Sequence, residues 1–161
     1  MTIDWRGVPV FGTPTKAATI RPSAYGIVRG RPGLIAVART PLGLFLPGGG
    51  SDESESPEAT VIRETREECG LTVGVGPWRR TAIEHAYSVG ERAHFEKRST
   101  FCDASVLGET GAPTESDHTL EWIPAAEAVE RLTPPSHRWA VSEWLGSLAP
   151  GAPIEVRPPA V

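Results

Sequence analysis

The sequence predicts an α/β fold in which one mixed β-sheet lies between layers of helices. Short apolar segments typical of strands occur both before and after a single acid-rich helix at residues 57–69. Two further helical segments follow near the C-terminus, so helices are available for both faces of the sheet. The length of 161 residues fits one domain with a hydrophobic core of its own.

The segments before this helix predict three short strands. Residues Tyr25–Val28 and Leu34–Ala38 are apolar, and Arg29–Gly33 between them has the glycine and proline content of a turn. A third strand is predicted at Leu44–Leu46. The first segment, Met1–Arg21, fits an irregular arm or an edge strand, and its composition favours neither.

The central helix has clear start and stop signals. It follows a glycine-rich loop, Pro47–Gly50, whose backbone can approach a ligand closely because glycine has no side chain. Ser56 can cap the free N–H groups of the first turn, and Pro57 suits the first helical position. Gly70 can adopt the left-handed conformation that ends a helix. These signals predict a helix from Pro57 to Cys69.

The segments after the helix predict further strands and a polar loop. Residues 72–85 contain one or two strands, which internal glycines and a proline interrupt. A loop at Gly90–Glu96 leads into a long strand at Lys97–Leu107, in which the residues alternate between two sets. Residues 108–118 are rich in glycine, proline, threonine and acids, which is typical of a surface loop.

The C-terminal third predicts one more strand, two helices and a tail. The strand is Leu120–Ile123, and the helices are Pro124–Leu132 and Ser136–Leu148. Residues 149–161 are rich in proline and glycine and have little to bury, so we expect a flexible tail after a single domain at residues 1–148.

Three carboxylates share one arc of the central helix. Glu64, Glu67 and Glu68 are neighbours because residues three and four positions apart meet on a helix surface. Like charges at these offsets repel, so a bound divalent cation would make the cluster favourable. Hard oxygen ligands suit Mg²⁺ or Mn²⁺ better than zinc, although a solvated acidic face is the alternative. The adjacent arc is predicted to be buried and consists of Val61, Ile62, Thr65 and Cys69.

The spacing in residues 49–71 resembles the Nudix hydrolase signature. That signature is a glycine, five residues, Glu, seven residues, Arg-Glu, a bulky apolar residue, any residue, Glu-Glu, any residue, Gly and an apolar residue. Thr65 stands where the family prefers a larger apolar residue, and it is not a ligand position. The matching positions are Gly49, Glu55, Arg63, Glu64, Glu67, Glu68, Gly70 and Leu71.

This resemblance implies a fold and an activity. The implied fold is the Nudix α/β/α sandwich with a mixed sheet. The implied activity is a metal-dependent pyrophosphohydrolase that splits a nucleoside diphosphate linked to another group. Glu64, Glu67 and Glu68 are the implied catalytic residues and, with the carbonyl of Gly48, the implied ligands of Mg²⁺ or Mn²⁺. Residues that the resemblance assigns to support of the site are Gly49, Glu55, Arg63 and Gly70.

The general base stays open at this stage. Glu64 or Glu68 could take the proton from the attacking water, and some family members use a glutamate from a later loop. Here Glu115, Asp117 and Glu121 are the candidates, with a solvated surface acid as the alternative for each.

The substrate is less determined than the reaction. A nucleoside triphosphate, oxidised or not, is expected because of its frequency in the family rather than because of any residue. A dinucleoside polyphosphate is the alternative, since Tyr87 lies sixteen residues after Leu71, near a tyrosine of that branch. A nucleotide-binding module without catalysis is a further alternative, although such modules usually lose signature acids. Phe45, Tyr87 and Lys97 could contact the substrate, and core packing or solvation is the alternative for them.

Composition limits the partners and the cellular compartment that can be expected for this protein. The net charge of −4 argues against broad binding to nucleic-acid duplexes, which requires clustered Lys and Arg. No apolar run reaches the roughly 20 residues of a membrane span, and the N-terminus lacks a signal-peptide pattern. Cys69 and Cys102 are expected to be reduced core thiols in a cytoplasmic protein. The Trp-rich last helix could close the core or form a homodimer contact.

Overall fold

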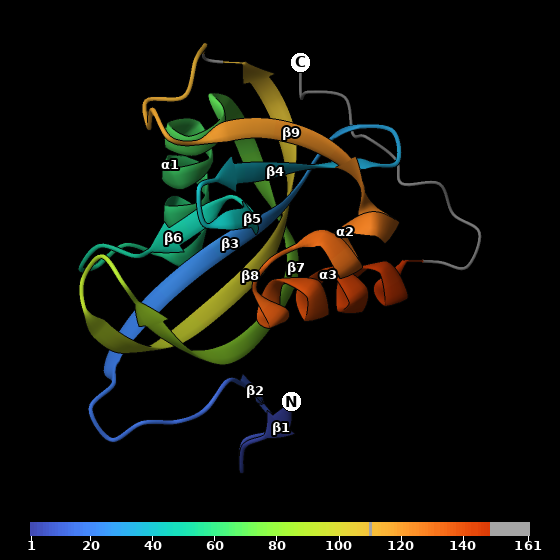
Figure 1. Cartoon of the computed structure of the whole chain (residues 1–161). Coiled ribbons are helices and arrows are strands. Elements are labelled where there is room, and N and C mark those ends of the chain that lie inside the picture. The colour runs from blue at the N-terminus through green and yellow to red at the C-terminus, as the bar shows by residue number, and fades with distance from the viewer. Residues whose placement is uncertain (110, 149–161) are drawn as a thin grey trace.

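The computed structural model describes residues 1–109 and 111–148, which form nine strands and three helices (Figure 1). All the strands belong to one mixed sheet. The elements are β1 (Thr2–Ile3), β2 (Pro9–Phe11), β3 (Thr19–Arg31), β4 (Leu34–Thr40), β5 (Gly43–Phe45), β6 (Gly48–Gly50), α1 (Pro57–Cys69), β7 (Leu71–Ser88), β8 (Ala93–Glu109), β9 (Thr119–Pro124), α2 (Ala125–Arg131) and α3 (Pro135–Ser147).

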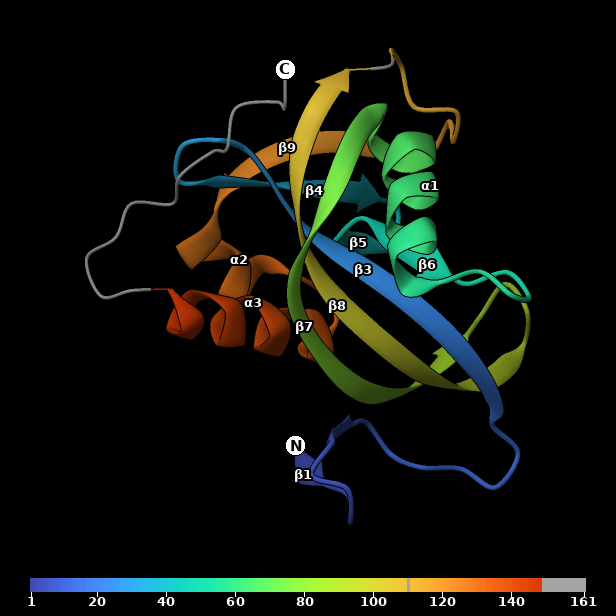
Figure 2. The ribbon, with the colours of Figure 1, turned by 180° about the vertical axis from the view of Figure 1, so that it is seen from behind.

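The helices lie on opposite faces of the sheet, as predicted. Helix α1 covers one face, and α2 and α3 cover the other, which the two opposed views make plain (Figures 1 and 2). Each face has its own hydrophobic core, so burial of apolar surface holds both layers in place. The core under α1 includes Val61, Cys69, Ala24, Val28 and Cys102. The core under α2 and α3 includes Ile27, Phe101, Leu132, Val141 and Trp144.

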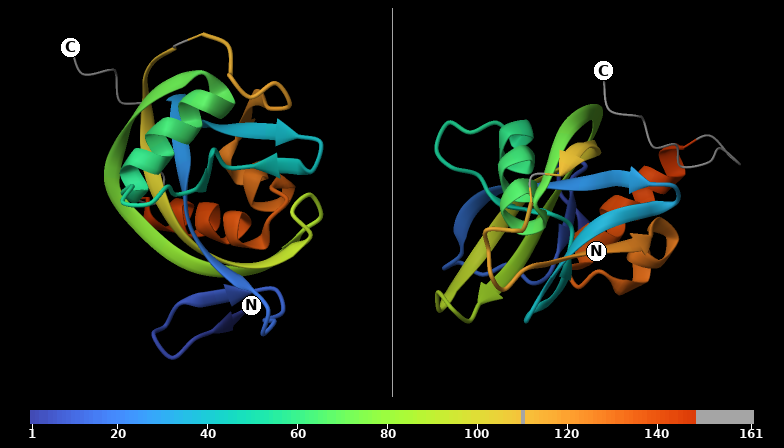
Figure 3. Two further views of the ribbon diagram at one scale, coloured as in Figure 1. Left: turned by 90° about the vertical axis from the view of Figure 1, so that its left-hand side faces the viewer. Right: turned by 90° about the horizontal axis from the view of Figure 1, so that it is seen from above.

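The centre of the sheet is a set of long paired strands. Strand β3 runs parallel to β8 over eleven residue pairs, from Thr19 with Phe95 to Arg29 with Ser105. It runs antiparallel to β4 on its other side, and β7 runs antiparallel to β8. Parallel and antiparallel pairs in one sheet confirm the predicted mixed topology. The long β7 and β8 strands curve strongly, as the side view shows (Figure 3).

The N-terminal segment resolves into a small hairpin at the edge of the sheet. Strands β1 and β2 pair antiparallel, and β2 pairs parallel with β7 through Val10 and Ile83. Figure 3 shows this hairpin projecting beyond the curved sheet. Trp5, between the two strands, is 93% exposed, so this tryptophan is not a core residue.

Several strands extend further than their apolar centres predicted. The predicted turn at Arg29–Gly33 is wrong in length, because β3 continues to Arg31 and only residues 32–33 turn. The predicted loop at Gly90–Glu96 is also wrong, since β8 already begins at Ala93 and the turn occupies residues 89–92. In both cases polar residues are paired with neighbouring strands, and an apolar pattern does not report that pairing.

The predicted break near Gly76 and Pro77 is a bulge within one strand. Strand β7 is continuous from Leu71 to Ser88, and its register against β8 shifts between Val75 and Arg79. The bulge is held by Asp103, whose Oδ1 accepts a hydrogen bond of 3.1 Å from the backbone N–H of Trp78.

The glycine run before the helix is part of the sheet rather than a loop. Strand β6, Gly48–Gly50, pairs antiparallel with β3, with Gly48 opposite Tyr25. Gly48 has φ of 150°, and a Cβ there would lie 2.2 Å from the carbonyl oxygen of Ala24. Only glycine fits this position, so the sequence allows the backbone to pass close to β3.

Helix α1 has the predicted boundaries and caps. Ser56 Oγ accepts a hydrogen bond of 3.1 Å from the N–H of Ala59, and Gly70 ends the helix with φ of 67°. Thr65 is fully buried in the predicted stripe, and its hydroxyl has no hydrogen-bond partner among the described residues. Helices α2 and α3 match their predictions to within one residue at each end.

Three further expectations concern the cysteines, membrane-spanning helices and the C-terminal tail. Cys69 and Cys102 are buried free thiols, as predicted. No helix in the described ranges has the length and apolarity needed to cross a membrane. The predicted tail at residues 149–161 lies outside the described residues.

Candidate functional site

Arg63 of α1 ties the loop before the helix to two of the signature acids. Its Nε and Nη2 lie 2.9 Å from the two carboxylate oxygens of Glu55. Its Nη1 lies 3.0 Å from Glu64 Oε1 and 3.3 Å from Glu67 Oε2, and Nη2 also donates to the carbonyl of Gly50 at 3.1 Å. Hydrogen bonds to the carboxylate, of which those from Arg63 have the largest effect, lower the pKa of Glu55 to about 2. One guanidinium therefore positions three carboxylates.

Glu68 is buried at the C-terminal end of the same helix. Its Oε1 accepts a hydrogen bond of 2.8 Å from the backbone N–H of Gly48, and its Oε2 lies 3.0 Å from His118 Nε2. Burial raises the pKa of Glu68 to about 8, and the neighbouring charges of Glu64 and Glu115 act in the same direction. A buried carboxylate with such neighbours needs positive charge nearby to stay ionised at neutral pH.

The loop at residues 111–118, which precedes β9, contacts helix α1. The backbone N–H groups of Thr114 and Glu115 donate to the carbonyl of Glu67, at 2.9 and 3.1 Å. The loop also passes close to Gly70, where a Cβ would lie 2.0 Å from the carbonyl oxygen of Gly111. These contacts bring Glu115 next to the acids of α1, 47 or more positions earlier in the chain.

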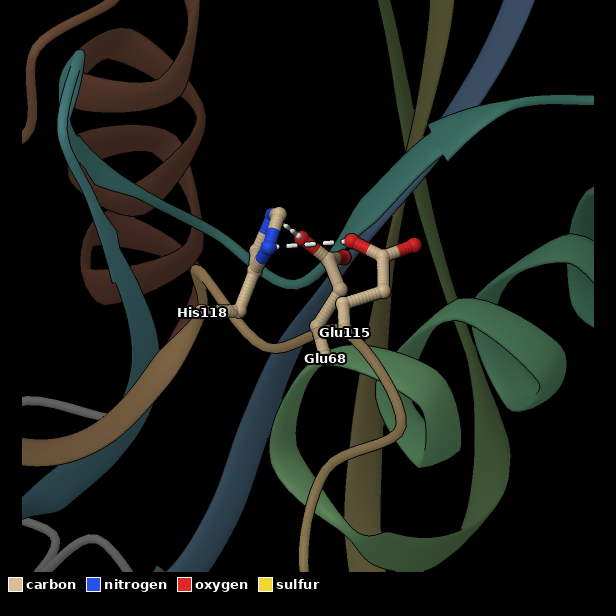
Figure 4. A group of neighbouring side chains, drawn as sticks. All are labelled: Glu68, Glu115 and His118. Carbon is tan, nitrogen blue, oxygen red and sulfur yellow. Dashed lines mark ion pairs between the residues drawn. The ribbon is translucent and has the colours of Figure 1, made fainter.

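The acids divide into two groups that share Glu115. Glu68, Glu115 and His118 form one group, and Glu64, Glu67 and Glu115 form the other. Within each group, one ligand atom from each residue lies within 4.8 Å of the others. Figure 4 shows the first group, with Glu68 from α1 facing His118 and Glu115 from the loop. The three helix acids are thus divided between two groups that Glu115 joins, an arrangement that the helical spacing did not predict.

The donor set fits a divalent cation with oxygen ligands. Carboxylates dominate both groups, which suits Mg²⁺ or Mn²⁺. Burial also raises the pKa of Glu64, so a cation would relieve the cost of its charge. Gly49 lies against the site, because a Cβ there would be 2.9 Å from Glu64 Oε1, and a larger residue would displace that carboxylate. The backbone of β6 also contacts the site, because the N–H of Gly48 donates to Glu68 Oε1.

A cavity of about 310 Å³ opens beside Glu68. Its volume falls at the lower end of the range of about 300–1,000 Å³ that is typical of small-molecule sites. One end is polar, and the walls are mainly aromatic and apolar. The polar end consists of Gly48, Glu68, Asp117 and His118. The walls include Tyr25, Pro41, Leu42 and Phe45.

A second cavity of about 440 Å³ adjoins the first. The two share Leu42 and Phe45, so these side chains stand between them. Tyr87 and Lys97 line the second cavity, and therefore all three residues considered for substrate contact border one or both cavities. Tyr87 is half exposed and packs against His94, with ring centroids 4.8 Å apart.

Two sequence interpretations change at this site. Glu121, one candidate for the general base, lies on β9 and pairs with Arg39 at 2.7 and 3.0 Å, which lowers the pKa of its carboxyl. It belongs to neither acidic group. His118 was not assigned from the sequence, yet it contacts Glu68 and Glu115 directly. The only local signal was its position three residues after Glu115 in an acid-rich loop.

The raised pKa of Glu68 predicts how pH and metal change stability. A carboxyl with an ordinary pKa of 4.5 when unfolded and about 8 when folded stabilises the folded state fully below pH 4.5. That contribution is lost as pH rises toward 8. We therefore expect Mg²⁺ to raise the melting temperature more at pH 8 than at pH 6. The rise at pH 8 should exceed the rise at pH 6 by roughly 5 °C.

Thermal melts at both pH values, with Mg²⁺ and with chelator, measure this difference. In Glu68→Gln the pH dependence of the metal effect should shrink, whereas the same change at Glu58, at the start of α1, should leave it intact. An equal metal effect at both pH values in the unmodified protein would contradict the prediction.

Comparison with known sequences matches this chain to a family. The family model described as NUDIX domain matches residues 19–145. A Mycobacterium tuberculosis protein described as "Putative 8-oxo-dGTP diphosphatase 3" is 29% identical over 99 residues, which is 62% of this chain. The matched part is only 44% of that relative, so the chain spans less than half of its length.

Solved structures share the fold at low sequence identity. A MutT protein from Methanosarcina mazei has a TM-score of 0.61 at 19% identity, covering 83% of this chain and 97% of that one. An Ap4A hydrolase from C. elegans has a TM-score of 0.61 at 15% identity, covering 81% of this chain and 100% of that one. The family match over most of the chain, with the intact acid spacing on α1, shows that this protein belongs to the Nudix family.

Proposed function

We propose that the protein is a metal-dependent pyrophosphohydrolase that splits a phosphoanhydride bond of a nucleotide. One observation carries the proposal: four carboxylates converge, and one of them, Glu68, lines a cavity with one polar end and apolar walls. Such a cavity suits a nucleoside, and the acids suit a cation that neutralises its phosphates. The convergent carboxylates are Glu64, Glu67, Glu68 and Glu115.

The proposed metal ligands are the acids of α1 and the carbonyl of Gly48. When bound, Mg²⁺ or Mn²⁺ supplies positive charge to the phosphate oxygens and lowers the pKa of a bound water. The protein orients these ligands before the substrate arrives. Arg63 fixes Glu64 and Glu67, and the N–H of Gly48 fixes one oxygen of Glu68.

Glu115 is the best placed of the later-loop candidates for the general base. It takes part in both acidic groups, and the hydrogen bonds to the Glu67 carbonyl fix the backbone on which it stands. Glu64 and Glu68 are the alternatives on α1, although both oxygens of Glu68 already have partners. Asp117 has a more exposed side chain and faces His118. A base must lie within hydrogen-bond reach, about 3 Å between heavy atoms, of the water from which it removes the proton.

The proposed substrate is a nucleoside triphosphate, including oxidised forms. The M. tuberculosis relative supports this choice through its description as an 8-oxo-dGTP diphosphatase. A dinucleoside polyphosphate is the second candidate, because a second cavity bordered by Tyr87 and Lys97 adjoins the first. A binding module without catalysis is disfavoured, since every signature acid is kept and Glu64, Glu67 and Glu68 all belong to the acidic groups.

A nucleotide panel tests this function. We expect Mg²⁺ to support release of pyrophosphate and a nucleoside monophosphate from a triphosphate such as 8-oxo-dGTP, and chelator to abolish it. The preferred compound should exceed the others by at least about 100-fold in kcat/KM. Preferential cleavage of Ap4A would favour the second candidate. Binding of nucleotides without any product, with Mg²⁺ or Mn²⁺, would refute the proposal.

A further inference from the structure

His118 faces carboxylates that come from two different elements (Figure 4). Its Nε2 is 3.0 Å from Oε2 of Glu68 on α1. Its other ring nitrogen, Nδ1, is 2.9 Å from Oε2 of Glu115 and 2.8 Å from Oδ1 of Asp117. The side chain is only 17% exposed, so these contacts are sheltered from solvent.

We propose that His118 is itself a ligand of the metal ion, through Nε2, next to Glu68. The inference rests on the proposed metal dependence and changes the expected ligand set from oxygen alone to oxygen and nitrogen. The implied ligands that the signature places on α1 are all acids, and the signature does not include this residue. The nitrogen comes from the loop that precedes β9, which docks on the end of α1 through Glu67.

The geometry around the ring fits a metal-binding imidazole. Two neighbouring ligands of an octahedral ion at about 2.1 Å lie about 3 Å apart, and Nε2 lies 3.0 Å from Glu68 Oε2. A ligating histidine usually donates its second ring N–H to a carboxylate, which fixes the ring orientation. Asp117 and Glu115 stand at that second nitrogen, Nδ1.

A nitrogen ligand has a consequence for metal choice. Imidazole suits transition metals such as Mn²⁺ and Co²⁺, whereas Mg²⁺ prefers oxygen ligands and retained waters. His118 should therefore strengthen the binding of Mn²⁺ more than the binding of Mg²⁺. The alternative is that the imidazole takes the place of the metal ion as the positive charge among the acids. In that case His118 competes with the metal ion.

Mn²⁺ binding to the whole protein, without nucleotide, separates these two interpretations. Electron paramagnetic resonance of free Mn²⁺ gives the affinity, and its pulsed form detects a nitrogen bound to the ion. We expect a nitrogen coupling in the unmodified protein that changes when histidine is labelled with ¹⁵N. His118→Asn should abolish the coupling and weaken Mn²⁺ binding at least about tenfold, with a smaller loss for Mg²⁺ measured by competition.

His94→Asn is the matched control, because His94 is exposed on β8 and packs against Tyr87. It should leave both the coupling and the affinity unchanged. The absence of nitrogen coupling in the unmodified protein would overturn the proposal even if His118→Asn failed to fold. Equal or tighter Mn²⁺ binding by a folded His118→Asn would also overturn it. If one of these two results is found in a protein that still shows metal-dependent hydrolysis, only the nitrogen ligand is refuted. If the unmodified protein binds no metal at all, the proposed function is refuted as well.

Discussion

Glu68→Gln should lower turnover roughly a thousandfold or more while the fold is retained. Glutamine has the same shape as glutamate and can still accept the hydrogen bond from the N–H of Gly48. The substitution removes the buried charge that the metal is proposed to balance, so the folded state should not be destabilised. Steady-state kinetics with the preferred nucleotide, alongside a thermal melt without metal, measure both effects.

The matched control for this substitution is Glu58→Gln, in the first turn of the same helix. Glu58 is not in either acidic group and pairs with Arg79 on β7. Its loss should leave turnover within about threefold of the unmodified protein. If Glu68→Gln retained turnover to the same extent as Glu58→Gln, Glu68 would have no part in the reaction.

Arg63→Ala should reduce both stability and turnover. Its guanidinium contacts Glu55, Glu64, Glu67 and the carbonyl of Gly50, and the Glu55 carboxylate that it binds is largely buried. Removing it leaves close carboxylates without their counter-charge, which should cost about 2–3 kcal/mol in the free energy of unfolding. Turnover should fall about 100-fold, because Glu64 and Glu67 lose the group that orients them. Chemical denaturation and steady-state kinetics provide the two measurements.

Two further substitutions test whether the losses in Arg63→Ala depend on the position and the shape of the guanidinium. Arg63→Lys keeps the charge but lacks the planar fork that binds both oxygens of Glu55, so its losses should be intermediate. Arg66→Ala, at an exposed position of the same helix, should change the free energy of unfolding by no more than about 0.5 kcal/mol. Equal losses at Arg63 and Arg66 would contradict the central position of Arg63.

Prediction from the sequence was most successful where the signals are local. The bounds of α1 follow from Ser56, Pro57 and Gly70, whose effects reach only a few residues along the chain. Strand ends were less well predicted, since the polar ends of β3 and β8 are held by pairing with distant strands.

The sequence by itself determined the family, the α/β fold class and the acids that α1 presents. The tertiary structure alone decided which acids meet, that Gly48–Gly50 joins the sheet, and that Glu115 and His118 complete the cluster. The reason is physical. Helical periodicity relates residues three or four positions apart, but the approach of Glu115 depends on hydrogen bonds to the carbonyl of Glu67 from a loop 47 positions later.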